Sequence, residues 1–353
     1  MQTESIELSF LSIFAFITFF VFLIVSKYFN SSNNNTLLDT DFLKPQAFHN
    51  EAIPRSGGLA SIISLFVFFG IYYLLFSKIL YDYIFLCTSL FFLGYLDDMK
   101  IKINPKQRLF LMTLFLTVLI NFLQIEIKHM DLIFLNSWLE NNFFSTIFIL
   151  LCFLFIINGA NLVDGFNGLL VINLIIINSL LLAINLKNNQ IEFSFLITAQ
   201  IIILISFLLF NFPKAKMFFG DSGSYLFGSL TVMNIIETNN KNPEISSFFF
   251  CVILFYLFFE VFFSFFRKLL LKKSPLKPDD KHLHMLFYKY LERSGKFIDS
   301  NYITSLFINL IYAFFTLPII FFKNNGIVCR YWFFSLLILY IIFYLRIYSF
   351  TKK

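Results

Sequence analysis

Residues 143–186 read FFSTIFILLCFLFIINGANLVDGFNGLLVINLIIINSLLLAINL. The two apolar runs, 143–163 and 168–186, are each long enough to cross a bilayer, because about 20 helical residues span its hydrocarbon core. Between the runs stand Asn, Asp and Gly residues with almost no linker. Polar groups at membrane depth are costly unless they line a polar cavity, and glycine permits irregular backbone there. The stretch therefore indicates a membrane protein with a polar site at one end of a helix pair.

The rest of the chain repeats this apolar pattern. Of its 353 residues, 58% are hydrophobic and 14% charged, with a mean hydropathy of +0.78, whereas a soluble domain carries about a quarter charged residues. We expect an all-α polytopic integral membrane protein, one domain over residues 1–353, with about eleven transmembrane helices and about ten as the alternative count. The expected spans lie near 8–25, 59–76, 79–96, 109–125, 143–163, 168–186, 193–212, 222–237, 246–266, 304–322 and 331–350.

Lysine and arginine residues set the expected orientation. With these spans, 21 of the 27 Lys and Arg residues fall on one side and 6 on the other. The positive-inside rule then places the N-terminus outside and the C-terminus in the cytoplasm, so the net charge of +6 needs no nucleic-acid partner. The expected cytoplasmic loops are about 26–58 (with a low-complexity stretch at 31–35), 97–108, 158–168, 213–221 and 267–303.

Two acidic motifs stand at the cytoplasmic ends of expected spans. Gly94-Tyr95-Leu96-Asp97-Asp98 closes one helix, where adjacent carboxylates repel each other and meet an unfavourable helix dipole. Phe219-Gly220-Asp221-Ser222-Gly223-Ser224 opens another helix, and a helix N-terminus binds phosphate well. Each motif has a plainer interpretation, namely a solvated Asp97–Asp98 pair and a simple N-cap at Asp221.

The turn at 158–168 is the third motif. Eight of its eleven residues are small or polar, which is more than a tight turn between helices requires, although such a turn is the alternative. We therefore expect Asn158, Asn161, Asp164 and Asn167 to lie at a polar cavity.

The fourth motif lies in the long cytoplasmic loop, as Pro278-Asp279-Asp280-Lys281-His282-Leu283-His284. Two histidines beside several lysines form a basic patch that suits a pyrophosphate, and Arg267 adds a bidentate phosphate partner. The alternative for His282 and His284 is a solvated surface pair.

Together the motifs predict one site on the cytoplasmic face. Hard oxygen ligands without cysteine indicate Mg²⁺, with Mn²⁺ as the alternative, because Mg²⁺ takes carboxylates together with substrate phosphates. Carboxylates, a divalent cation and basic groups are the parts used for phosphoryl transfer. The predicted participants are Asp97, Asp98, Asn161, Asp164 and Asp221, surrounded by Arg108, Arg267, His282 and His284.

The order of these motifs closely resembles the polyprenyl-phosphate N-acetylhexosamine-1-phosphate transferases of glycosyltransferase family 4. The resemblance runs from Ile53-Pro54-Arg55-Ser56-Gly57-Gly58 to His284 and rests on GYLDD, NLVDGFNGL, FFGDSGS and DKHLH. It implies transfer of N-acetylhexosamine 1-phosphate from a UDP-sugar to undecaprenyl phosphate with release of UMP. It also implies a bacterial inner-membrane enzyme with its active site on the cytoplasmic face, starting a surface glycan such as O-antigen of lipopolysaccharide, common antigen or a wall polymer. UDP-GlcNAc is the default donor, and members of this family often form homodimers.

The resemblance also implies roles for individual residues. Asp97, Asp98 and Asp164 resemble catalytic acidic residues, one of the Asp97–Asp98 pair being the base that deprotonates the lipid phosphate. Asp221 resembles the principal Mg²⁺ ligand, with Asn161 beside it. The substrate-binding candidates are Arg108, Asn158, Asn167, Arg267, His282 and His284.

Two positions depart from the family pattern. Met285 stands where a third histidine is common, and Asn167 stands where a second acidic residue is common. Both substitutions put the choice of donor in doubt.

A membrane transporter of a polar or anionic solute is the alternative function, since polar residues at membrane depth also mark substrate paths. It predicts polar groups spread along the helices at mid-membrane, whereas we interpret those of this chain as gathered at one surface.

Overall fold

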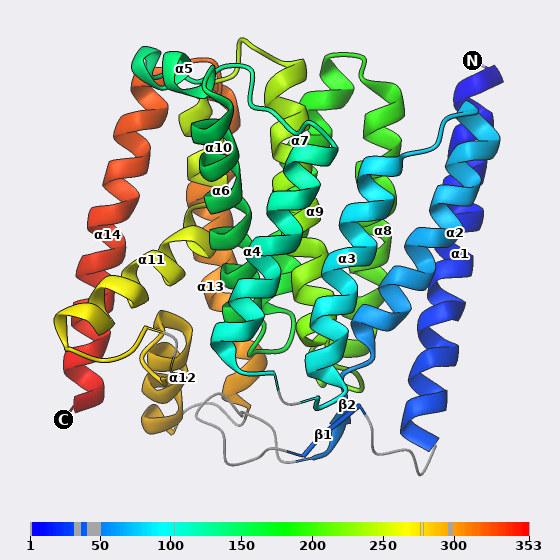
Figure 1. Cartoon of the computed structure of the whole chain (residues 1–353). Coiled ribbons are helices and arrows are strands. Elements are labelled where there is room, and N and C mark those ends of the chain that lie inside the picture. The colour runs from blue at the N-terminus through cyan, green and yellow to red at the C-terminus, as the bar shows by residue number, and fades with distance from the viewer. Residues whose placement is uncertain are drawn as a thin grey trace.

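The expected spans are helical in the computed structural model of the protein, although those at 246–266 and 304–322 are each divided between two helices. The structure describes residues 2–31, 37–40, 51–101, 103–275, 277, 279–295 and 299–352. The helices form a bundle with the two chain termini at opposite ends (Figure 1). The predicted low-complexity stretch at 31–35 lies almost wholly outside the described residues, as do parts of the loops 26–58 and 267–303. In chain order the helices are α1 (Gln2–Ser31), α2 (Gly57–Phe76), α3 (Tyr81–Asp98), α4 (Pro105–Phe122), α5 (Ile133–Leu139), α6 (Asn142–Val163), α7 (Leu169–Lys187), α8 (Ile191–Asn211), α9 (Gly220–Lys241), α10 (Ser247–Ile253), α11 (Phe255–Leu270), α12 (Leu283–Ser294), α13 (Ser300–Thr316), the 3₁₀ helix η1 (Pro318–Phe322) and α14 (Gly326–Lys352).

The number of membrane spans is seven or eight when the described helices are judged by length and apolar composition. Seven qualify singly, and α10 with α11 qualifies as a bent pair. The protein is therefore a polytopic, mostly helical membrane protein. The expected count of eleven spans includes three more helices, α3, α4 and α9. Their ends carry the charged residues Asp97, Arg108 and Asp221, respectively. That count and the predicted orientation stay predictions.

The expected single helix at 246–266 is wrong in shape. It breaks at Leu254 into α10 and α11, which meet at a bend of 75°, and α11 leaves the bundle sideways toward α14 and α12 (Figure 1). A straight continuation would leave Glu260 within an apolar span, which is costly for an unpaired carboxylate. The bend instead brings Glu260 against His282 and Tyr340.

The all-α prediction has one exception among the described residues, a two-stranded antiparallel ribbon of β1 (Leu38–Asp39) and β2 (Ile53–Pro54). The backbone of this segment is tied to the chain ahead of α9, because the Phe218 N–H donates to the Pro54 carbonyl at 2.9 Å. The ribbon lies at the same end of the bundle as the end of α3 (Figure 1). These bonds position Arg55, the residue that follows β2.

Buried amides in the middle of the bundle correct the expectation that polar groups gather at one surface. Asn234 of α9 donates to Asn178 of α7 at 3.1 Å and to Gln200 of α8 at 2.7 Å, and Tyr83 of α3 donates to Asn234 at 3.3 Å. The three amide side chains are completely buried. Amides that satisfy one another between helices are a common means of joining membrane helices, so we interpret this cluster as structural rather than as a solute path.

Gly94 permits the close approach of α3 to the start of α9. A Cβ atom at this position would lie 2.4 Å from the Asp221 carbonyl oxygen and 2.5 Å from the Ser222 nitrogen. We expect Gly94→Ala to destabilise the protein by about 1–3 kcal/mol, because neither backbone atom can move freely, and so to lower its melting temperature in detergent. The matched control is Gly70→Ala in α2, where an added Cβ meets nothing within 4 Å; equal melting temperatures for the two variants would contradict this account.

Candidate active site

The N-terminus of α9 is the centre of the site. Gly220 adopts a φ of +77°, and the Asp98 carboxylate at the end of α3 accepts three hydrogen bonds from the residues that follow. The donors are the backbone N–H groups of Asp221 and Ser222, both at 2.9 Å, and the Ser222 hydroxyl at 2.6 Å. Asp98 is only 1% exposed. It therefore caps a helix from another part of the chain, in the place where an anion binds best.

Asp98 thus corrects both plainer interpretations of the acidic motifs. The Asp97–Asp98 pair is not a solvated pair, because Asp98 is buried and fully hydrogen-bonded. Asp221 is not the N-cap of α9 either, because it lies within the first turn and its own N–H is one of the two that Asp98 caps. The Asp221 side chain is left to face the site.

Asp97 and Asp221 are joined by one guanidinium group. Nη1 of Arg108, from the first turn of α4, donates to Asp97 Oδ2 and to Asp221 Oδ2, the latter at 3.2 Å. Asn161 of α6 donates to the other Asp221 oxygen at 2.8 Å and to the Ser224 hydroxyl at 3.2 Å. Helices α3, α4, α6 and α9 therefore converge at Asp221. The predicted residues Asp97, Arg108 and Asn161 lie around it.

Asp164 borders this cluster from the turn after α6. Burial raises the pKa of its carboxyl well above the usual range, and the charge of nearby Asp221 adds to the effect while Arg55 opposes it. Arg55 also forms an ion pair with Asp39 at 2.7 Å and approaches Asp98 at 3.9 Å. Sequence reasoning did not select Arg55 as a site residue, although it stands inside the Ile53–Gly58 segment that carried the family resemblance.

Two of the predicted residues are not brought to the acidic cluster. Asn158 donates to the Leu154 carbonyl of its own helix at 2.7 Å. The Asn167 side chain donates to the Pro213 carbonyl at 2.9 Å, and its backbone N–H bonds to Asn301 at 2.9 Å. Asn167 therefore braces neighbouring loops in this structure.

The histidine loop forms a second cluster that is buried rather than solvated. His282 is 2% exposed and His284 is fully buried, so the alternative of a solvated surface pair is wrong. Burial lowers the pKa of His284 to about 4, which makes its ring neutral near pH 7. The ring lies 5.6 Å from that of Phe166, two residues after Asp164. Phe166 thereby links the histidine loop to the acidic cluster.

Two guanidinium nitrogens of Arg267, at the end of α11 beside this loop, and one ring nitrogen of His284 lack partners within the described part of the chain. Arg267 pairs with Asp279 at 3.0 Å through Nη2, but its buried Nε and Nη1 have no hydrogen-bond partner among the described residues, and neither has His284 Nε2. Unsatisfied buried N–H groups are costly. Such groups fit an anionic ligand that would accept from them, as a phosphate does.

The side chains of the acidic cluster are also possible ligands of a metal ion. Among the described residues, no three His, Cys, Asp or Glu side chains converge to form a ready cage. Asp97 and Asp221 nevertheless offer two carboxylates around a single cationic group, Arg108. Mg²⁺ usually binds one or two carboxylates and completes its shell with waters and substrate phosphates. These residues therefore fit a Mg²⁺ ion that arrives with a phosphate-bearing substrate.

The sequence profile described as glycosyl transferase family 4 matches residues 81–239. An undecaprenyl-phosphate alpha-N-acetylglucosaminyl 1-phosphate transferase of Thermotoga maritima is 28% identical over 241 residues, which cover 68% of this chain and 69% of that protein. A phospho-N-acetylmuramoyl-pentapeptide-transferase of Dictyoglomus thermophilum is 32% identical over 243 residues, covering 63% and 74%. A probable undecaprenyl-phosphate N-acetylglucosaminyl 1-phosphate transferase of Bacillus subtilis is 26% identical over 247 residues, covering 67% and 66%.

Proposed function

Because this chain belongs to glycosyl transferase family 4, we propose that it transfers N-acetylhexosamine 1-phosphate from a UDP-sugar to undecaprenyl phosphate. UMP is the second product, and UDP-GlcNAc is the donor that we put first. The observation that carries the proposal is the convergence of Asp97, Arg108, Asn161 and Asp221 at one end of a membrane bundle. A reaction between a soluble nucleotide sugar and a lipid phosphate needs such a polar site at the membrane surface.

The proposed reaction exchanges one phosphoanhydride for another. An oxygen of the carrier phosphate attacks the sugar-bearing phosphorus, a new P–O bond forms, and the bond from that phosphorus to the oxygen bridging to UMP breaks. Asp97 lies at the acidic cluster with one carboxylate oxygen on Arg108, and we assign it the proton of the carrier phosphate. Arg108 and the unpartnered N–H groups of Arg267 would offset the phosphate charges.

A bound Mg²⁺ would neutralise the pyrophosphate and polarise the reacting phosphorus. Asp221 would hold it, with Asn161 adjacent. The sequence predicts Asp98 to be catalytic. In this proposal it acts by fixing the start of α9 and hence the position of Asp221. Location in the bacterial inner membrane, with this end of the bundle in the cytoplasm, follows from the predicted orientation and belongs to the proposal.

The function is tested with the purified protein in detergent, undecaprenyl phosphate and a panel of UDP-sugars, following release of UMP. We expect release with a UDP-N-acetylhexosamine, abolition by EDTA and recovery with excess Mg²⁺. Omission of undecaprenyl phosphate is the control for simple hydrolysis of the donor. Absence of UMP with every donor would overturn the proposed function, and undiminished release in EDTA would overturn the assignment of Mg²⁺.

A further inference from the structure

Glu260 of α11 is a buried carboxylate outside the acidic cluster. It is 1% exposed and has three hydrogen-bond partners. His282 Nδ1 lies 3.1 Å from Oε2, the Leu283 N–H donates to Oε1 at 3.2 Å, and the Tyr340 hydroxyl donates to Oε1 at 2.9 Å. A buried carboxylate is tolerated only when it is paired and hydrogen-bonded, and here all its partners belong to or surround the histidine loop.

Two of these contacts orient His282. Leu283 is the first residue of α12, so Glu260 accepts from the free N–H of a helix N-terminus and fixes where the loop ends. A carboxylate on Nδ1 keeps the proton there and sets the direction of the ring, as outer partners of a functional histidine commonly do. His282 Nε2 is thereby directed toward Asp279 Oδ1 at 3.4 Å. Asp279 in turn holds Arg267, which carries the unpartnered donors.

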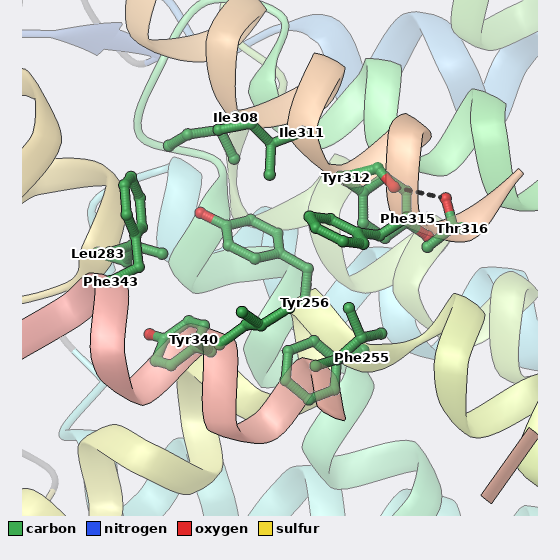
Figure 2. Close-up of a pocket in the computed structure, with 12 residues that line it drawn as sticks. Phe255, Tyr256, Leu283, Ile308, Ile311, Tyr312, Phe315, Thr316, Tyr340 and Phe343 are labelled. Atoms are coloured by element: carbon green, nitrogen blue, oxygen red, sulfur yellow. Dashed lines mark hydrogen bonds between the residues drawn. The ribbon is translucent and has the colours of Figure 1, made fainter. Parts of the chain in front are cut away.

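The third contact brings in α14, the last helix. Tyr340 of α14 and Tyr256 of α11 stand together on the wall of an apolar cavity of about 230 Å³, whose other lining residues are almost all aliphatic or aromatic (Figure 2). Their rings face the cavity while their hydroxyls reach the polar network, Tyr340 to Glu260 and Tyr256 to His284 Nδ1 at 3.2 Å. The polar network around Glu260 therefore lies beside an apolar cavity, and in such surroundings hydrogen bonds to a charged group are strong.

We propose that Glu260 is a positioning residue: braced by Tyr340, it holds His282 and the start of α12 so that the histidine loop presents its donors to the nucleotide-sugar phosphates. The inference rests on the proposed function. Through Tyr340, α14 becomes part of the framework of the site, although it lies beyond residues 81–239, which match the family profile. Glu260 itself does not touch substrate.

The main test is Glu260→Gln, which keeps an oxygen for Leu283 and Tyr340 but turns an N–H group toward His282. Because the loop binds the donor before and during reaction, we expect the KM for the UDP-sugar to rise about 10-fold, with kcat changed by less than about 3-fold. The KM for undecaprenyl phosphate should not change. The matched control is Glu192→Gln, an exposed glutamate that pairs with Lys78 and should leave both constants unchanged.

A double-mutant cycle tests whether Glu260 acts through His282. We expect the donor KM of Glu260→Gln/His282→Ala to equal that of His282→Ala within about 2-fold. Once the His282 ring is absent, Glu260 has no ring to position. Multiplied effects of the two substitutions would overturn the proposal, as would an unchanged donor KM in folded Glu260→Gln.

Two further measurements remain decisive if Glu260→Gln folds poorly or if the wild-type protein releases no UMP. Tyr340→Phe removes one hydroxyl and should raise the donor KM about 3-fold, whereas Tyr331→Phe, at a position 71% exposed on the same helix, should not. Hydrogen exchange of the first turn of α12 needs no activity at all and should quicken in Tyr340→Phe but not in Tyr331→Phe. Unaltered exchange in Tyr340→Phe would overturn the positioning role, whereas an inactive wild type would overturn only the proposed function.

Discussion

Asp221→Ala is expected to abolish UMP release, with a loss of at least about 10³-fold. Its side chain is the point on which the cluster converges, since Arg108 and Asn161 each bond one of its two oxygens. Loss of one preorganised charge-stabilising group in a phosphoryl-transfer site commonly costs about 10²–10³-fold, and here the same change also removes the proposed Mg²⁺ ligand. The measurement is the initial rate of UMP release at saturating donor and carrier, with protein recovery checked by gel filtration.

The matched control is Glu237→Ala, in the same helix at its opposite end, where the carboxylate pairs with Lys241 at 3.3 Å. We expect this variant to keep near wild-type activity. Full turnover by Asp221→Ala would remove the acidic cluster from the reaction altogether. Equal losses in both variants would show that the effect comes from the folding of α9 rather than from the site.

Asp98→Asn is expected to lose both activity and stability. The carboxylate accepts two backbone N–H groups and one hydroxyl, and an amide cannot accept on both sides, so that one N–H group of the substituted side chain must face a donor. Hydrogen bonds to a buried charged group contribute about 1.5–3 kcal/mol each. We therefore expect destabilisation of about 3 kcal/mol, seen as a lower melting temperature in detergent, and a severe fall in the rate of UMP release because the start of α9 shifts.

Asp97→Asn provides the comparison that separates the two neighbouring aspartates. Asp97 bonds to Arg108 at the edge of the site, and its side chain is 15% exposed. We expect this variant to lose activity while its melting temperature falls less than that of Asp98→Asn, because Asp97 is part-buried and pairs with Arg108 alone, whereas Asp98 accepts three hydrogen bonds. If Asp98→Asn melted like the wild type, its assignment as the cap of α9 would be wrong.

Much of the site was predictable from the sequence because the relevant signals are local. Asp97, Asp98, Asn161, Asp164 and Asp221 each stand where an apolar run ends, and a helix end is recognisable from composition alone. Their meeting at one end of the bundle followed from counting spans between them. Asn158 and Asn167 have the same local character but bond to Leu154 and Pro213 instead, so local pattern over-selects polar residues in a motif.

The roles of the residues were not predictable in the same way. Nothing in the pair Asp97–Asp98 tells which carboxylate caps a helix more than 120 positions away and which faces Arg108. Glu260 stands in an otherwise apolar run and has no motif around it, although a lone carboxylate in such a run is itself a signal of a buried partner. The bend at Leu254 could not be predicted from proline or glycine, since neither is present there, and it brings Glu260 to His282 and Tyr340.

By itself the amino-acid sequence determined that this is a helical membrane protein of the phosphosugar transferase type, with acidic and basic motifs at its helix ends, because hydrophobic length and motif order are properties of short segments. Only the tertiary structure decided that Asp98 caps α9, that Arg108 joins Asp97 to Asp221, and that Glu260 contacts His282 of the histidine loop. Hydrogen bonds and ion pairs between helices depend on which faces meet and at what depth. Those relations come from packing across the whole bundle.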